Sequence, residues 1–96
     1  MSTLIPSQSR LSNVLIMRGL TNRQAEVAVL VTMGLSNAEI GNQLFITERT
    51  VKTHLMSIYY TMSLKSRAQL IVWCLPHLSS NYDDVIAEFN ASKAGA

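Results

Sequence analysis

Hydrophobic residues recur through the middle of the chain with the period of an α-helix. The longest stripe is spaced i, i+4, i+7, i+11 and consists of Val51, Leu55, Ile58 and Met62. This spacing keeps one face of a helix buried. We predict four core helices, over residues 22–33, 37–44, 48–61 and 67–75. Long runs of alternating β-branched residues and Asn-Gly or Asp-Gly turns do not occur in the sequence, which favours an all-α fold.

Polar residues and helix breakers mark the boundaries of these helices. Three of the predicted starts carry a hydroxyl residue followed three positions later by Gln or Glu, the capping-box pattern: Thr21, Ser36 and Ser66. Thr47 supplies a cap without the reciprocal partner. Gly34 is expected to end the first helix in the left-handed conformation, and Pro76 to end the last one.

Helical spacing also occurs near both ends of the chain. Leu11 and Leu15 predict a short leading helix within an N-terminal arm over residues 1–19. Beyond the central module, residues 20–76, a stripe behind an acidic first turn predicts an added helix in a C-terminal extension over residues 77–96. Its members are Tyr82, Val85, Ile86 and Phe89.

Length and composition limit the class of protein. A chain of 96 residues with 48% hydrophobic residues can form one packed domain. The longest fully apolar run, residues 70–75, is far shorter than the roughly 20 residues that span a bilayer, so we expect no membrane partner. The single cysteine, Cys74, cannot form an internal disulfide, which favours a reducing, cytoplasmic compartment.

Two neighbouring helices and their charges point to nucleic acid. The link between the 37–44 and 48–61 helices is only residues 45–47, which is typical of a helix-turn-helix whose second helix enters the DNA major groove. Opposite the buried stripe, that second helix carries cations, hydroxyls, a ring and a thioether without a carboxylate: Arg49, Thr53, Met56, Ser57 and Tyr60, with Lys52 on the flank. This face suits contacts with phosphates and bases.

Four short motifs occur in a specific order: LTNR at 20–23, GLSNAEI at 34–40, LFITERTVKTH at 44–54 and KSRAQL at 65–70. In this order and spacing they resemble the LuxR-type (GerE-type) DNA-binding domain of bacterial transcription regulators, over about residues 20–75. The resemblance implies a four-helix module that binds double-stranded DNA as a homodimer and lies at the nucleoid when bound.

The resemblance also implies roles for individual positions. Lys52, Thr53 and Met56 hold the positions that approach bases. Four further residues hold positions near phosphates or bracing the recognition helix: Thr47, Thr50, Lys65 and Arg67. Arg49 and Tyr60, from the outward face, complete the predicted DNA-binding set. We expect no metal, cofactor or enzyme activity, because the sequence lacks ligand spacing, a nucleophile–base pair and a glycine-rich phosphate loop.

The last predicted helix is apolar on two faces. We expect Ala68, Ile71, Val72 and Leu75 to face the core. The other face is assigned to the dimer interface, since the last helix of the family commonly forms it: Leu70, Trp73, Cys74 and His77. Either a second subunit or the C-terminal stripe could cover this face, and the two coverings can coexist. Glu26 is either a plain exposed acid or the partner of Arg67 or Lys52.

The chain departs from the family pattern at several positions. Gln24 stands where Glu is usual, Gly41 where Ala is usual, residues 61–63 read Thr-Met-Ser instead of Lys-Leu-Gly, and Met56 replaces a residue that is often basic. Fewer cations predict weaker DNA binding or dependence on a partner.

Two functions follow from these observations. The first is a sequence-specific transcription regulator, with RNA polymerase as a further partner. The alternative is an interaction module that pairs with a larger LuxR-type regulator as antagonist or heterodimer partner. Residues 1–19 are too short for the receiver or signal-binding domain that usually precedes this module, so the sequence is that of either a stand-alone regulator or a fragment.

Overall fold

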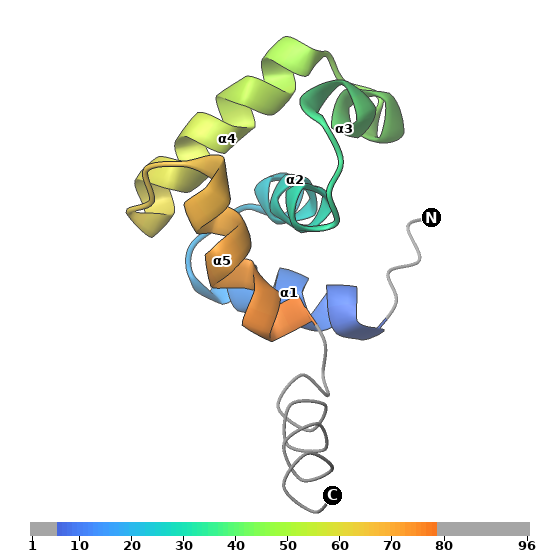
Figure 1. Ribbon diagram of the computed structural model, residues 1–96. Helices are drawn as coiled ribbons and strands as arrows, with labels where there is room; N and C mark the ends of the chain where they lie inside the picture. Colours follow the sequence, from blue (N-terminus) through green and yellow to red (C-terminus); the bar gives the residue numbers. More distant parts are fainter. Residues whose placement is uncertain (1–5, 79–96) are drawn as a thin grey trace, which may run out of the picture.

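The computed structural model describes residues 6–78, which form five helices (Figure 1). They are α1 (Pro6–Met17), α2 (Asn22–Thr32), α3 (Asn37–Leu44), α4 (Glu48–Met62) and α5 (Arg67–Leu78). No strand occurs within these residues, and the all-α prediction is confirmed. The leading helix is longer than the short one that the spacing predicts. The helix predicted around Tyr82 and Phe89 lies outside the described residues.

Side-chain caps begin the helices largely as the sequence predicts. Thr21 and Ser36 each form a complete capping box, in which the hydroxyl accepts from the N3 backbone and the N3 side chain accepts from the cap. Ser66 forms only half of one. Its hydroxyl accepts from the Gln69 N–H at 3.1 Å, but the Gln69 amide oxygen accepts from the Lys65 N–H at 2.7 Å.

Left-handed residues end two of the helices. Gly34 has φ +94° and closes α2, as predicted, with the Gly34 and Leu35 N–H groups donating to carbonyls of the last turn. Ser63 closes α4 with φ 57°. The prediction that Pro76 ends the last helix is wrong, because α5 continues to Leu78. Because proline lacks a backbone N–H, Pro76 removes a single hydrogen bond from the last turn of α5. The helix continues for two residues despite this loss.

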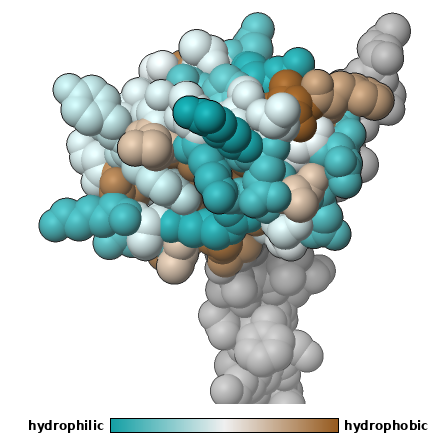
Figure 2. Space-filling model, turned by 90° about the horizontal axis from the view of Figure 1, so that it is seen from above, coloured by the Kyte–Doolittle hydropathy of each residue, from teal (hydrophilic) through white to brown (hydrophobic). Residues whose placement is uncertain are grey.

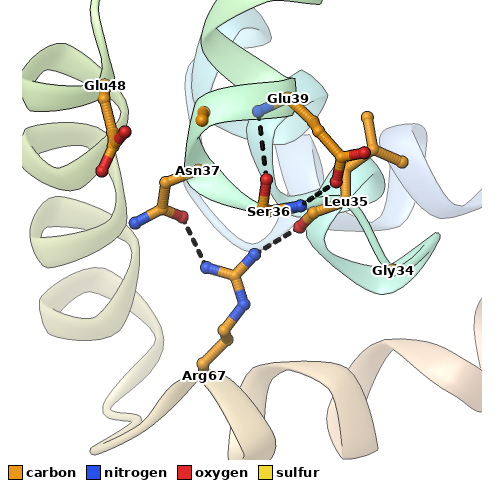
Figure 3. A pocket seen from close by; sticks show the side chains of 8 residues that line it. Gly34, Leu35, Ser36, Asn37, Glu39, Glu48 and Arg67 are labelled. Carbon is orange, nitrogen blue, oxygen red and sulfur yellow. Dashed lines mark hydrogen bonds between the residues drawn. The ribbon is translucent and has the colours of Figure 1, made fainter.

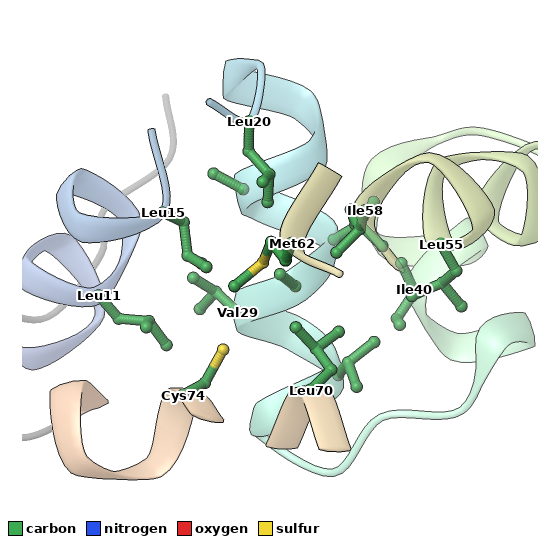
Figure 4. Packing of buried hydrophobic residues seen from close by; sticks show 14 of the residues in the cluster. Leu11, Leu15, Leu20, Val29, Ile40, Leu55, Ile58, Met62, Leu70 and Cys74 are labelled. Atoms are coloured by element: carbon green, nitrogen blue, oxygen red, sulfur yellow. The ribbon is translucent and has the colours of Figure 1, made fainter. Parts of the chain in front are cut away.

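Helix α2 lies at the centre of the fold, packed against each of the other four helices. Its buried residues are Ala25, Val27, Ala28, Val29 and Val31. The stripe of α4 is buried against them, which confirms its predicted orientation. Leu11 and Leu15 of α1 are fully buried on the other side of α2, next to α5 (Figure 4). Figure 1 shows α3 and α4 at the top of the molecule and α1 below α2, with α5 running downward beside α2 to α1.

The predicted orientation of α5 is wrong. Leu70 and Cys74 are fully buried, whereas Val72 is 69% and Leu75 41% exposed. Ala68 is exposed as well, and Ile71 is partly buried. The reason is α1, which packs along the face of α5 that was predicted to form the dimer interface. Burial raises the pKa of the Cys74 thiol, so the side chain stays neutral in the core.

Glu26 pairs with neither of its predicted partners. Its carboxylate lies 3.4 Å from the Arg23 guanidinium, one turn earlier on α2. Arg67 and Lys52 contact other residues, described below. No helix within residues 6–78 has the length and apolar character needed to cross a membrane.

Candidate nucleic-acid interface

Helix α4 begins at a well-defined cap that positions its first turn at the surface. The Thr47 hydroxyl accepts from the Thr50 N–H at 3.1 Å and lies 2.9 Å from the Thr50 hydroxyl. Unpaired N–H groups at a helix start attract anions. The predicted contacts Thr47 and Thr50 lie at this start, but the Glu48 carboxylate in the same turn opposes the attraction of a phosphate.

The face of α4 opposite the core carries the predicted reading residues. All five are exposed: Arg49, Lys52, Thr53, Met56 and Tyr60. Met56 is 73% and Tyr60 89% exposed, although both are large and partly apolar. Seen from above, the surface over α3 and α4 is mostly hydrophilic, with a few hydrophobic side chains among polar ones (Figure 2). The outward orientation predicted for these five residues is thus confirmed, while their contact with DNA stays a prediction.

The flank of this face carries a carboxylate next to the predicted reading residues. Glu48 Oε2 lies 3.8 Å from Lys52 Nζ, one turn away on α4, with both side chains more than half exposed. A surface pair of this kind contributes little to stability and is easily broken. Lys52 can therefore leave Glu48 for a phosphate or a base, but the free chain has a weaker positive field than its cations alone suggest.

Arg67 braces the module, which is one of the two roles that its position implies. Its guanidinium donates to Asn37 Oδ1 at 2.6 Å and to the Leu35 carbonyl at 2.5 Å. Figure 3 shows the side chain reaching from α5 to the loop between α2 and α3. Both bonds fix the start of α3, and α3 in turn packs against α4. Lys65, in the link before α5, is exposed and remains a candidate phosphate contact.

Two of the residues assigned to the predicted dimer interface are buried within the single chain. Leu70 and Cys74 have no exposed surface within the single chain, because α1 and α2 cover them. Trp73 and His77 are partly buried, and their rings lie 4.9 Å apart. The Arg18 guanidinium lies 5.6 Å from the Trp73 ring, so contacts within the chain already hold this tryptophan.

Two residues of the site were not assigned roles from the sequence. Asn37 is part of the GLSNAEI motif, but its contact with Arg67 spans thirty positions and left no local signal. Phe45, in the turn between α3 and α4, is 94% exposed and has φ 58°. The available signal in the sequence is a large hydrophobic residue in this turn, at a left-handed position that glycine adopts with the least strain.

Comparison with known families agrees with this geometry. A family profile described as "Bacterial regulatory proteins, luxR family" matches residues 18–74. The match covers more than half of the chain and includes the whole of α2, α3 and α4.

Three curated relatives are similar over the same region. The probable csgAB operon transcriptional regulatory protein of Salmonella typhimurium is 41% identical over 59 residues, 62% of this chain and 27% of that protein. LiaR of Bacillus subtilis is 41% identical over 61 residues, 64% and 29% of the two chains. DegU of Brevibacillus brevis is 45% identical over 53 residues, 55% and 22%. The chain thus spans less than a third of these relatives. No solved structure gives a significant match.

Proposed function

The chain belongs to the luxR family of bacterial regulatory proteins, and on that premise we propose that it binds specific double-stranded DNA sequences and regulates transcription. In this proposal α4 enters the major groove as the recognition helix. The relatives described above are named as transcriptional regulators, which supports this class of function.

One observation carries the proposal. Helix α4 is buried along one face, at Val51, Leu55 and Ile58, and exposes cations, a hydroxyl and large side chains along the opposite face. Because α2 and α3 both pack against α4, its exposed face is held in a fixed orientation. A rigid helix that presents donors and cations is what reading of base edges in the major groove requires.

We further propose that the DNA-bound form is a dimer formed through the exposed face of α5. Val72 and Leu75 are the large apolar residues exposed there, and they replace Leu70 and Cys74 in the interface. A second copy bound symmetrically would place a second recognition helix on a related half-site. Val72→Glu should then leave the fold intact and abolish two-to-one binding in sedimentation with DNA; unchanged stoichiometry would contradict the interface.

Selection from random duplexes, followed by affinity measurement at one fixed salt concentration, tests the proposed function. Lys52→Ala should weaken binding to the selected site by about 1–3 kcal/mol, roughly 5- to 150-fold. Arg23→Ala is the matched control, because it also removes a cation from an exposed ion pair, but on α2. It should change affinity by less than about twofold, since a surface cation outside the recognition helix adds only a screened field.

Two results would contradict the proposal. Failure to enrich any sequence would argue against specific DNA binding. Equal losses in Lys52→Ala and Arg23→Ala would show that only total charge matters. Stable association with a larger LuxR-type regulator in the absence of DNA binding would instead favour the antagonist function.

A further inference from the structure

The centre of the exposed face of α4 is apolar where a DNA-reading helix commonly presents hydrogen-bond donors. Met56 is 73% exposed and lies one turn after Thr53. The Thr53 hydroxyl donates to the Arg49 carbonyl at 3.2 Å, so its hydrogen is already engaged within the helix. Thr53 is therefore left with a methyl group and acceptor lone pairs to offer a base, and Met56 with a thioether that is at most a weak acceptor.

Among the groups on the major-groove edges of base pairs, one fits the thioether of Met56 beside the Thr53 methyl group. Guanine, adenine and thymine present acceptors, and cytosine and adenine present amino donors. Each of these polar groups would lose hydrogen bonds with water if it were covered by a thioether. The C5-methyl group of a pyrimidine is the apolar feature of the groove. A flexible, polarizable methionine can adjust its shape to pack on that methyl.

The surroundings of Met56 favour DNA over an apolar protein surface as its partner. Arg49 and Lys52 are exposed on the same side of α4, two turns and one turn before Met56, and Lys52 pairs with Glu48 in the free chain. Cations around an apolar centre match phosphates around a methyl group, whereas a hydrophobic protein groove would have to desolvate them.

We propose that Met56, supported by Thr53, is a specificity-determining residue that selects the C5-methyl group of a pyrimidine in the bound sequence. This inference rests on the proposed function and deepens it, because it names the chemical group that the recognition helix reads. In ordinary DNA the group belongs to thymine, and in methylated DNA it can also belong to 5-methylcytosine.

Single-atom changes in the DNA test the proposal. In the selected duplex, each thymine is replaced in turn by deoxyuridine, which lacks only the methyl group, and the Kd is measured by fluorescence anisotropy. At one position per half-site the original chain should lose about fourfold in affinity, the scale of burying one methyl group. The same replacement should cost Met56→Ala less than twofold. With cytosine at that position, the duplex should be bound more tightly when the cytosine carries a 5-methyl group. If the methyl group raises affinity on thymine only, the assignment to the methyl group is overturned.

A matched variant separates side-chain shape from loss of fold. Met56→Leu keeps an apolar side chain and should retain most of the preference for thymine over deoxyuridine. Since Met56 is exposed, all variants should unfold at the same temperature as the original chain. Specific binding that is insensitive to deoxyuridine at every position, or equally sensitive in Met56→Ala, overturns this inference alone. Absence of any specific binding overturns the proposed function as well.

Discussion

The contact of Arg67 with the loop before α3 offers a direct way to separate stability from DNA contact. Arg67→Lys keeps the positive charge but cannot reproduce the two-pronged donation to Asn37 Oδ1 and the Leu35 carbonyl. Arg67→Ala removes the charge and both bonds. If Arg67 braces the module, both variants should lose stability, and the lysine should restore only part of it.

The structure sets the size of the expected loss. A hydrogen bond from a charged donor contributes about 1.5–3 kcal/mol, and Arg67 makes two such bonds. The side chain is only partly buried, so water replaces part of each bond after substitution. We therefore expect about 2–3 kcal/mol for Arg67→Ala. Arg23→Ala, which breaks an exposed pair, should cost less than about 0.5 kcal/mol.

Urea unfolding followed by far-ultraviolet circular dichroism measures these losses, with DNA affinity measured under conditions where each variant is fully folded. Folded Arg67→Ala should bind the selected duplex within about threefold of the original chain, since a bracing residue acts mainly on the folded fraction. A stability change below 0.5 kcal/mol, with an affinity loss as large as that of Lys52→Ala, would refute the bracing role and make Arg67 a phosphate contact.

Three further predictions follow from the backbone and the caps. Ser63→Gly should raise stability by about 1 kcal/mol in the same urea experiment, because Ser63 closes α4 in the left-handed conformation, whereas Ser63→Ala should not. Gly41→Ala should lower stability by about 1–3 kcal/mol, because the added Cβ would lie 2.7 Å from the Ile46 carbonyl oxygen, a backbone atom that cannot easily move. Hydrogen bonds from the backbone and the hydroxyl of Ser36 lower the pKa of Glu39. The stability that the Glu39 carboxylate adds to the fold is therefore present above the ordinary carboxyl pKa and is lost as the pH falls through the lowered value. The stabilities of the original chain and of Glu39→Gln should thus converge in acid.

Features that depend on nearby residues could be predicted from the sequence. The bounds of α3 match the prediction, because a cap at Ser36 and a short apolar stripe determine them within a few residues. The exposed face of α4 was likewise predicted, since one buried stripe fixes the orientation of a helix. The sequence alone therefore indicates the candidate reading residues, among them Lys52 and Met56.

Features that depend on distant residues could not be predicted. The predicted orientation of α5 is wrong because the two apolar faces of this helix look alike in sequence. Packing against α1, more than fifty positions away, determines which face is buried. The partner of Arg67 could not be predicted for the same reason. Glu26 offers the opposite charge, but Arg67 donates to the side-chain amide oxygen of Asn37. Pairing across the fold is a property of packing, which local patterns do not record.

The most direct test of the account is to map the DNA contact on the protein itself. Addition of the selected duplex to the isotopically labelled chain, followed by backbone amide chemical shifts, reports which helix meets DNA. We expect the largest changes at residues 47–60, from the cap of α4 to Tyr60, and little change in α1. Changes elsewhere in the chain, with the amides of α4 unmoved, would contradict the assignment of α4 as the recognition helix.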